Sequence, residues 1–327
     1  MRGKTTIGRR ALLAAGAAAL ALPCPALSQG QWPAGRPIEL IVGFAPGGGT
    51  DVMLRALAPF LAAEIPGANF VVLNRPGAGG ETAYVAIQSA RPDGYTLGAI
   101  NTPGYLSVPV ERRVRYDRAK IRPIARLVDD PTALVVRQAS PHKSLRDLVE
   151  AARRKPGTIS VGSSGVGTDD HLGLTLLQAA TGTEFIHTPY AGAGLVKNAV
   201  LAGHIDVAGL NLGEIGILNQ ETPPLRALAA MGEKRWELMP NVPTFREEGF
   251  DVVMTSERGL AAPRGISDEI AARLQDAIAR VMAEPEWLAK AKQLELPLAY
   301  LPGAEWQAQM PAQEARYRGI WAATPWN

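Results

Sequence analysis

The chain has almost no cysteine, few aromatic residues and no long hydrophobic run. These absences exclude several classes of protein and of binding site. It has 327 residues, a single cysteine, Cys24, and 6% aromatic residues. A lone cysteine excludes a disulfide framework and a cysteine-rich metal site. The apolar run at residues 11–22 is too short for the about 20 residues that a membrane-spanning helix needs. A hydrophobic content of 46% still suffices for a buried core, most naturally divided between two domains.

Motifs of several enzyme classes are also missing. The histidines His142, His171, His187 and His204 have no metal-ligand spacing, and no HExxH motif occurs. Residues 162–166, GSSGV, lack the final glycine of G-x-S-x-G. The glycine-rich segments match neither of the two common nucleotide-binding patterns. We therefore expect no metal, no cofactor and no catalytic residue, and a Ser-His-Asp site assembled from scattered residues is a distant alternative.

Residues 1–28 have the pattern of an export signal. A basic start is followed by the small and apolar run, and the small residues at 26–28 offer a cleavage site. The basic residues are Arg2, Lys4, Arg9 and Arg10. The arginine pair resembles a twin-arginine signal, and a Sec signal is the alternative. We expect cleavage to remove Cys24, with lipid anchoring through this residue as the lesser alternative.

Cleavage changes the charge of the protein. The whole chain carries +3, and the signal holds four basic residues and no acidic one, so the mature chain carries −1. A slightly negative protein gives no electrostatic reason to bind nucleic acid. We therefore expect no nucleic-acid partner.

After the signal, short apolar stretches alternate with helical periodicity, a pattern typical of parallel α/β sheets. The predicted strands are residues 38–44, 70–74, 95–100, 133–137, 158–162, 184–190, 205–211 and 225–230. The predicted helices are residues 51–63, 81–90, 144–154, 171–181, 194–202, 267–283 and 304–320. Ser144 and Ser267 stand where helix N-caps are expected.

Two glycine-rich segments, each between a predicted strand and a predicted helix, are the most informative feature. They read FAPGGGTD at residues 44–51 and SSGVGTDD at residues 163–170. Glycines permit a positive φ there, and the Thr-Asp pairs can cap the helices. A helix start presents unpaired N–H groups and a partial positive charge, so it suits an anion. Two such starts indicate two lobes that hold one anionic ligand, with a tight turn as the alternative reading of each.

These segments and those that follow them resemble the Bug-type receptors, the extracytoplasmic receptors of tripartite tricarboxylate transporters. The resemblance covers essentially the whole chain after residue 28, in the order of the family. Its motifs are residues 44–51, NRPGAGG at 74–80, PDGYTL at 92–97, residues 163–171, TPYAG at 188–192, LRALA at 225–229, PNVPT at 240–244 and GLAAP at 259–263. Each motif alone is weakly specific, whereas eight in order are strongly specific.

The resemblance implies a two-lobed α/β fold of the type II periplasmic binding protein class. This is a Venus flytrap in which each lobe is a mostly parallel sheet flanked by helices. Crossover segments near residues 125–133 and 254–263 would join the lobes. The expected division is signal peptide 1–28, lobe 1 from residues 29–126 and 256–327, and lobe 2 from residues 127–255.

The resemblance also implies a function. The protein would capture a small organic carboxylate in the periplasm, with a mild preference for a dicarboxylate, for uptake by membrane transporter subunits. It would be a monomer and not an enzyme. A receptor that presents its closed form to a membrane signalling protein is the alternative with the same fold, and a periplasmic hydrolase is a distant one.

In such receptors a carboxylate is held between one loop of each lobe by main-chain N–H groups, hydroxyls and ordered waters. The expected contacts come from both glycine-rich segments and from residues that follow neighbouring strands. They are Ala45, Pro46, Gly47, Gly48, Thr50, Asn101, Thr102, Ser163, Ser164, Gly165, Thr168, His171, Tyr190, Gly192, Asn211 and Arg258. For His171 and Tyr190 a hydrogen bond within lobe 2 is the alternative, and Asn211 could instead satisfy backbone groups.

Two positions depart from the family pattern. Leu210 stands where an acidic residue is common, and Glu257-Arg258 stands where an aromatic residue is usual. Arg258 either adds a cation to the cleft, which would favour a second carboxylate on the ligand, or pairs with Glu257 at the surface.

Overall fold

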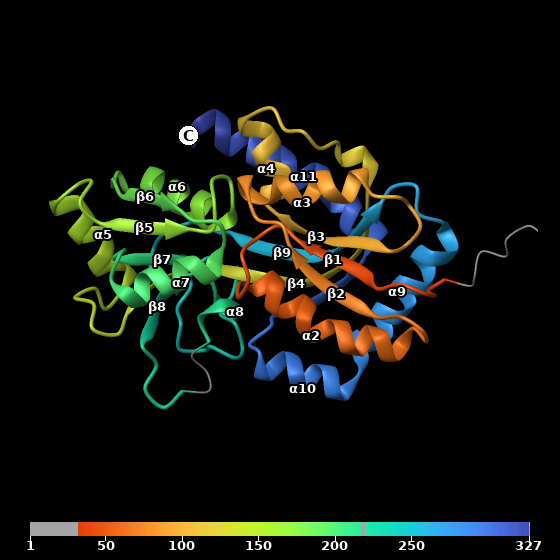
Figure 1. The fold of residues 1–327 in the computed structure, drawn as a ribbon. Helices are drawn as coiled ribbons and strands as arrows, with labels where there is room; N and C mark the ends of the chain where they lie inside the picture. The colour runs from red at the N-terminus through yellow and green to blue at the C-terminus, as the bar shows by residue number, and fades with distance from the viewer. Residues whose placement is uncertain (1–31, 217–219, 327) are drawn as a thin grey trace, which may run out of the picture.

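The structure is a computed structural model that describes residues 32–216 and 220–326. The predicted signal peptide, with Cys24, lies outside the described residues. Within the described part of the chain, no helix is long and apolar enough to cross a membrane. Figure 1 shows two lobes side by side, with long strands running between them.

Lobe 1 combines the N-terminal third of the chain with its C-terminal end. Its strands are β1 (Ile38–Val42), β2 (Phe70–Asn74), β3 (Thr96–Thr102) and β10 (Leu298–Pro302). Its helices are α2 (Gly49–Glu64), α3 (Glu81–Ser89), α4 (Gly104–Glu111), α9 (Asp268–Ala283), α10 (Pro285–Gln293) and α11 (Gly303–Ala323). Strand β1 lies between β2 and β3 and is parallel to both.

Lobe 2 is formed by the middle of the chain. Its strands are β5 (Ser160–Ser163), β6 (Ile186–Pro189), β7 (Val207–Asn211) and β8 (Leu225–Ala230). Its helices are α5 (Leu145–Arg154), α6 (Asp169–Thr181), α7 (Ala193–Ala202) and the single turn α8 (Leu212–Ile215). Strand β5 is parallel to both β6 and β7. Each lobe therefore contains the strand–loop–helix units that the sequence predicts, with parallel central pairs.

Two long antiparallel strands, β4 (Ile121–Arg137) and β9 (Thr255–Pro263), connect the lobes. Up to Pro131, β4 pairs with β9, and from Thr132 onward it pairs with β7 and β8 of lobe 2. Strand β9 also pairs with β3 of lobe 1. Of the two segments expected to join the lobes, residues 125–133 lie in β4, and residues 254–263 coincide with β9 except for Met254, which precedes it.

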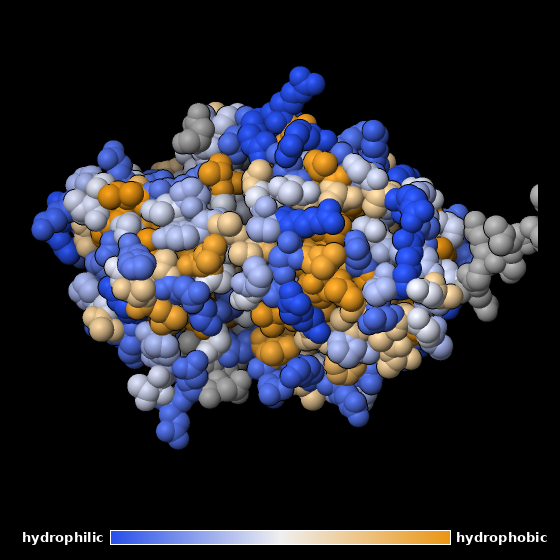
Figure 2. All heavy atoms as spheres, in the orientation of Figure 1, coloured by the Kyte–Doolittle hydropathy of each residue, from blue (hydrophilic) through white to orange (hydrophobic). Residues whose placement is uncertain are grey.

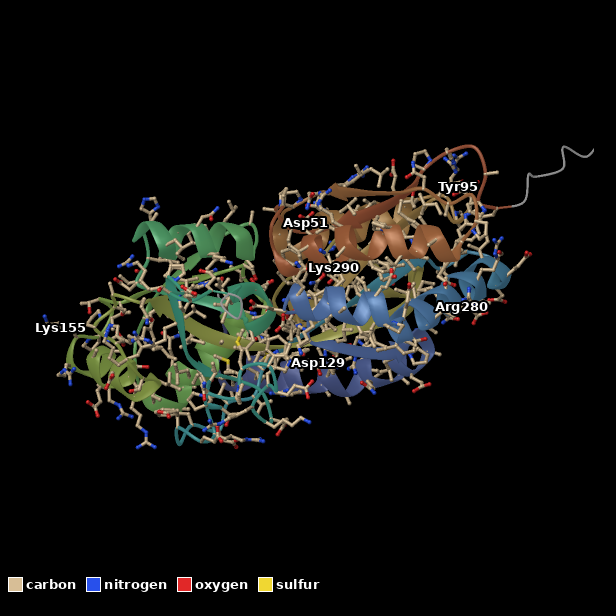
Figure 3. The ribbon with its side chains drawn as sticks, turned by 90° about the horizontal axis from the view of Figure 1, so that it is seen from below. Asp51, Tyr95, Asp129, Lys155, Arg280 and Lys290 are labelled. Atoms are coloured by element: carbon tan, nitrogen blue, oxygen red, sulfur yellow. The ribbon has the colours of Figure 1, made fainter. Side chains whose placement is uncertain are left out.

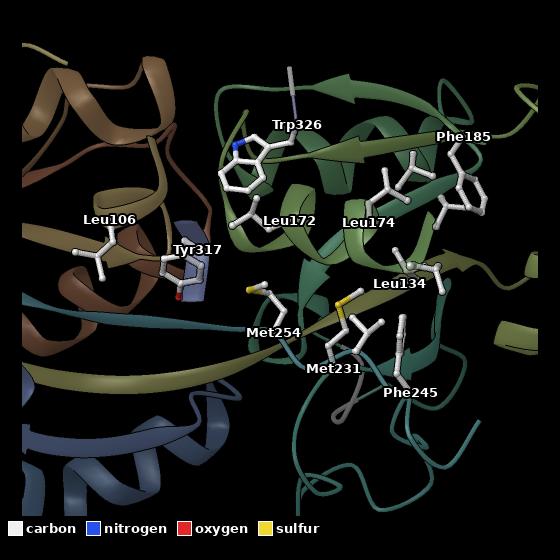
Figure 4. Close-up of a cluster of buried hydrophobic side chains, with 14 of the residues drawn as sticks. Leu106, Leu134, Leu172, Leu174, Phe185, Met231, Phe245, Met254, Tyr317 and Trp326 are labelled. Carbon is white, nitrogen blue, oxygen red and sulfur yellow. The ribbon is translucent and has the colours of Figure 1, made fainter. Parts of the chain in front are cut away.

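Three hydrophobic clusters fill the molecule. One lies within lobe 1, around α2, α9 and α10, and a second lies within lobe 2, around α7, β7 and β8. The third contains residues of both lobes. In Figure 4 its C-terminal members Tyr317 and Trp326 lie near Leu172 of α6 and Met254, which precedes β9. The end of the chain therefore packs across the junction of the lobes.

Local signals place several elements as expected. The Ser144 hydroxyl caps α5 and forms a reciprocal capping box with Asp147, and Ser267 caps α9. Both N-cap predictions are confirmed.

On the face drawn in Figure 2, hydrophobic residues form separate groups among hydrophilic ones.

Candidate functional site

The two glycine-rich loops meet where the lobes face each other. Loop 1 (residues 44–48) precedes α2, and loop 2 (residues 164–168) precedes α6. Figure 3 places Asp51, in the first turn of α2, at the end of that helix nearest the other lobe. The Ala45 N–H of loop 1 donates to the Ala191 carbonyl of lobe 2 over 2.9 Å. This bond joins the two lobes directly.

A small cavity, here called the inner cavity, lies between the lobes. Its volume of about 30 Å³ gives room for one or two waters. Eight residues that the sequence analysis predicts as contacts line it: Gly48, Thr50, Asn101, Thr102, Ser164, Thr168, Asn211 and Arg258. Its other lining residues are Phe44, Gly49, Gly104, Asp169, Ala193, Glu214 and Ser256. Both helix starts therefore open onto one cavity.

The other predicted residues lie around the inner cavity and do not line it. Gly165 and Tyr190 line a wider cavity outside it. Ala45, Pro46 and Gly192 form the contact between the lobes; a Cβ on Gly192 would lie only 3.0 Å from the Ala45 nitrogen. Gly47 bonds to Asp51, and Ser163 and His171 support loop 2 from within lobe 2.

The Asp51 carboxylate holds loop 1 in shape. It accepts hydrogen bonds from the Gly47 N–H (3.0 Å), Arg55 Nε (3.0 Å) and Asn74 Nδ2 (2.9 Å). Burial opposes its charge, but these bonds from Arg55, Gly47 and Asn74 lower the pKa of Asp51. Asp51 therefore stabilises the conformation of the loop and does not itself occupy the helix start.

Asp170 has the corresponding position in loop 2. Its carboxylate accepts from the Ser164 N–H (2.6 Å), the His171 N–H (3.0 Å) and the Thr168 hydroxyl. Burial, and then the neighbouring charge of Asp169, raise the pKa of Asp170 to about 8. Loop 2 is thus closed around an internal acid.

His171 organises loop 2 and lies away from the inner cavity. Its Nδ1 accepts from the Gly167 N–H over 3.1 Å, and its ring stacks on His187 at 3.9 Å. Burial lowers the pKa of His171 to about 3 and that of His187 to about 4, so both rings are neutral. Of the two roles left open for His171, this geometry corresponds to the hydrogen bond within lobe 2.

One hydroxyl group from each lobe lines the inner cavity. Asn101 Nδ2 donates to Thr50 Oγ1 over 2.7 Å, so the Thr50 hydroxyl keeps its own hydrogen for another acceptor. The Ser164 hydroxyl, like the Ser164 backbone N–H, interacts with the Asp170 carboxylate. A ligand anion at Ser164 would therefore compete with Asp170 for this donor.

Arg258 lies at the centre of the site, 2% exposed. Its guanidinium is 3.0 Å from Glu214 Oε1 and 3.3 Å from Asp130 Oδ2, and it donates to Asn211 Oδ1 over 2.6 Å. Burial opposes its charge, whereas Glu214 and Asp130 raise the pKa of Arg258. The cation that the sequence analysis places in the cleft is present, and it is already paired with carboxylates of the protein.

Glu214 is one of the lining residues that are not predicted from the sequence, and the one with a direct bond to the other lobe. It belongs to α8 of lobe 2, and its Oε1 accepts from the Gly49 N–H, at the start of α2 in lobe 1, over 2.9 Å. Its Oε2 accepts from the Asn211 N–H over 3.1 Å. A carboxylate of the protein thus occupies the helix start where the sequence predicts the carboxylate of a ligand.

Asn211 connects this centre to α6. Its Nδ2 donates to Asp169 Oδ2 over 2.7 Å and to the Asp130 carbonyl over 2.9 Å, and the Thr132 hydroxyl donates to the same Asp169 oxygen over 2.6 Å. Asn211 thus lines the inner cavity and also satisfies a backbone carbonyl. Both of its predicted roles are structurally compatible.

Glu257 is not the partner of Arg258. Successive side chains of a strand point to opposite faces, so Glu257 faces away from the cavity. There it accepts from Arg126 (2.5 Å), Thr102 (3.0 Å) and Trp306 (2.9 Å). The alternative of a surface pair between Glu257 and Arg258 is therefore wrong.

The acids outnumber the cations at this centre, and that predicts a pH dependence of stability. Burial is the main cause that raises the pKa of Asp130 from 3.8 to about 8, against the opposing charge of Arg258. Between these values the folded protein holds a proton that the unfolded chain has lost. The contribution of each such proton to the free energy of unfolding therefore falls as pH rises from about 4 to about 8, by about 1.4 kcal/mol per pH unit. His171 and His187, whose pKa values burial lowers from 6.5, contribute in the opposite direction below about pH 6.5. The total stability should therefore fall between about pH 6.5 and pH 8.

Urea denaturation at pH 6.5 and pH 8 measures this effect. Asp130→Asn removes one of the titrating groups, so the difference between the two pH values should shrink in this variant. Equal stability of the wild-type protein at both values would contradict the prediction.

No metal site accompanies these acids within residues 32–216 and 220–326, where no group of three or more His, Cys, Asp or Glu is placed to hold an ion. The four acids Asp130, Asp169, Asp170 and Glu214 are instead bonded to Arg258, hydroxyls, amides and backbone N–H groups. Their arrangement is that of a hydrogen-bonded network between two lobes.

Comparison with known proteins gives consistent matches over most of the chain. The family model described as tripartite tricarboxylate transporter family receptor matches residues 54–313. The UPF0065 protein in the gbd 5' region of Cupriavidus necator is 35% identical over 310 residues, which cover 94% of this chain and 93% of the relative. The structure of the periplasmic binding protein BugD superposes with a TM-score of 0.82 at 26% identity, covering 88% of this chain and 97% of that one. The structure of R. palustris Rpa4515 with adipate gives a TM-score of 0.82 at 29% identity, covering 89% and 97%.

The fold and the site define a two-lobed solute-binding protein with its site between the lobes, and the expected fold class is confirmed. The chain belongs to the family of tripartite tricarboxylate transporter receptors. The predicted Bug-type resemblance is therefore confirmed, and the protein is a solute-binding receptor and not an enzyme. Receptors of this family are periplasmic and work with transporter components, which implies export of this chain.

Proposed function

We propose that this receptor binds a small organic carboxylate in the cleft between its lobes, with a ligand carboxylate at the start of α2. The observation that carries this proposal is the position of Glu214. Its carboxylate accepts from the Gly49 N–H and pairs with Arg258, so these two groups already bind one carboxylate. A ligand carboxylate would take this place, and the Glu214 side chain would turn away from the Gly49 N–H.

The donors from both lobes fit this role. Thr50 of lobe 1 and Ser164 of lobe 2 both line the inner cavity, and the Thr50 hydroxyl has a hydrogen to donate. Neutral donors hold an anion without the desolvation cost of a buried cation. Rpa4515, which is 29% identical to this chain, has a structure with adipate. This supports a dicarboxylate as the ligand class here.

Closure of the lobes would be the output of binding. We propose that the lobes divide near residues 126/127 and 255/256 and that β4 and β9 carry the hinge. The change of partners of β4 between Pro131 and Thr132 supports a hinge in this region. A ligand shifts the open–closed equilibrium only by its differential affinity for the closed form.

Substitution of the two hydroxyls tests the proposed contacts. Thr50→Val keeps the size of the side chain and Ser164→Ala removes only the hydroxyl, and each should weaken carboxylate binding by about tenfold or more, since hydrogen bonds to charged groups are worth about 1.5–3 kcal/mol. Isothermal titration measures the change, with unchanged melting temperature as the control for folding. Unchanged affinity in both variants would contradict the two-loop site.

A thermal-shift screen with mono-, di- and tricarboxylates and amino acids tests the function itself. A ligand at a hundredfold excess over its Kd stabilises the native state by about 2.7 kcal/mol. The expected result is a clear shift with one acid and none with its amide or ester. Binding of an uncharged compound in place of every acid would contradict the proposal.

For export, we propose that residues 1–28 form the signal peptide, with the twin-arginine route favoured by the Arg9-Arg10 pair. We also propose that the exported receptor acts as a monomer that delivers its ligand to transporter subunits of the membrane. Replacement of both arginines by lysine should stop export if the twin-arginine route is used, and fractionation of the periplasm reports it.

A further inference from the structure

A second and much wider cavity opens next to the inner cavity. Its volume is about 730 Å³, and Phe44 and Ser164 line both cavities. We call it the outer cavity. Its lining comes from both lobes, since Gly77, Ala78 and Gly79 belong to lobe 1, and Tyr190 and Ala191 belong to lobe 2. The two cavities therefore adjoin at Phe44 and Ser164, and a ligand chain that passes these residues would enter the outer cavity.

The size of the inner cavity makes such a continuation necessary for larger ligands. About 30 Å³ is room for one or two waters, which suits a carboxylate group and not a carbon chain. The rest of a bound acid has to extend beyond Phe44 and Ser164. The chemistry of the outer cavity would then decide which acids are preferred.

Three arginines line the outer cavity, at the end of α4 and just after it. Arg112 Nη1 lies 2.6 Å from Glu81 Oε2, and Arg115 Nε lies 3.2 Å from Glu81 Oε1. Glu81 is only 3% exposed and is held by both of them. Arg113, between these two, is exposed and has no acidic partner among the described residues.

The remaining acid of the outer cavity does not cancel this charge. Burial raises the pKa of Glu111, so its negative charge is disfavoured there, and the charge of Arg112 opposes this only in part. Glu81 already serves two arginines. The outer cavity therefore has a surplus of positive charge, in contrast to the acid-rich centre around Arg258.

We propose that the outer cavity is a second anion subsite in which Arg113 binds the distal carboxylate of an extended dicarboxylate. This rests on the proposed function, because the first carboxylate lies at the start of α2. Arg258 is paired with Glu214 and Asp130 inside the protein, so the cation for a second carboxylate is Arg113 and not Arg258. Tyr190, on the lobe 2 side, lines the same cavity.

Titration with two homologous series tests the subsite. The first contains α,ω-dicarboxylates from three to ten carbons, and the second contains monocarboxylates of the same lengths. In the wild-type protein, affinity should rise with length among the dicarboxylates, reach a maximum and exceed that of the matching monocarboxylate. Arg113→Ala should weaken the best dicarboxylate by about fivefold or more and leave the monocarboxylates unchanged. Arg113→Glu should weaken that dicarboxylate further.

Arg264→Ala is the matched control. Arg264, like Arg113, is an exposed arginine of lobe 1, but it follows β9 and lines neither cavity. Equal loss for both series, or no change in Arg113→Glu, would overturn the subsite. If wild-type protein binds monocarboxylates as tightly as dicarboxylates, the proposed function stands and the subsite is overturned. If no acid of either series binds, the proposed function fails as well.

Discussion

Replacement of Glu214 by glutamine is expected to raise the affinity for small carboxylates by about tenfold. In the present structure Glu214 accepts the Gly49 N–H and pairs with Arg258, so it competes with a ligand for both groups. Glutamine keeps the size of the side chain and removes its charge. A hydrogen bond between charged groups is worth about 1.5–3 kcal/mol, and about 1.4 kcal/mol corresponds to a factor of ten in affinity.

Isothermal titration with the acid found by thermal shift measures the gain. Glu184→Gln is the matched control, because it makes the same change of charge at an exposed position of lobe 2. The ligand-free variant should also melt at a lower temperature, since a contact between the lobes is lost. A tenfold loss of affinity would show instead that Glu214 acts with the ligand, and would contradict its role as a competitor.

The sequence predicts the parts of the site that are local. Each glycine-rich loop belongs to a strand, a turn and a helix that follow one another in the sequence. The residues that determine such a loop lie within a few positions of each other, so the loop can be predicted from the sequence alone. Thr50 and Ser164 are predicted for that reason, and both line the inner cavity. Their direct contact with a ligand stays a prediction.

Glu214 could not be predicted in this way. Its bond to Gly49 joins positions 165 residues apart, and α8, from which it projects, is a single turn between β7 and β8. No periodicity marks a helix of four residues. One signal was available: Asn211 and Glu214 have the spacing of a capping box, which the structure contains.

The strands between the lobes show a second limit. Pro123 and Pro131 interrupt β4, and proline in an apolar run argues against an interior strand. Only residues 133–137 of β4 are predicted as a strand from the sequence, and they follow the second of these prolines. Strand β9 contains polar, charged and small residues, which do not alternate in hydropathy. Its pairing with β3 and β4 makes it a strand, and this tertiary context outweighs local propensity.

Replacement of Arg258 by methionine is expected to lower the free energy of unfolding by about 3–5 kcal/mol at pH 8, because it leaves buried carboxylates without their cation. Asp130 is fully buried, and Glu214 and Asp169 lie in the same network. Methionine fills part of the volume, so the loss reports charge more than packing. Arg258→Lys keeps the charge and should recover part of the stability.

The pH dependence of this variant separates the two causes. Without Arg258 the pKa of Asp130 should rise above its wild-type value of about 8. Below about pH 8 both folded proteins then hold this proton and the loss of stability is constant, whereas at higher pH only the wild type releases it and the loss grows. The expected loss is therefore larger at pH 9.5 than at pH 7, measured by urea denaturation of wild type and variant. A loss of equal size at both values would mean that packing around Arg258, and not its charge, stabilises the junction. In that case the Arg258 side chain would stabilise the junction by packing between β9 and α8. Glu214 would then still accept from the Gly49 N–H when Arg258 is replaced.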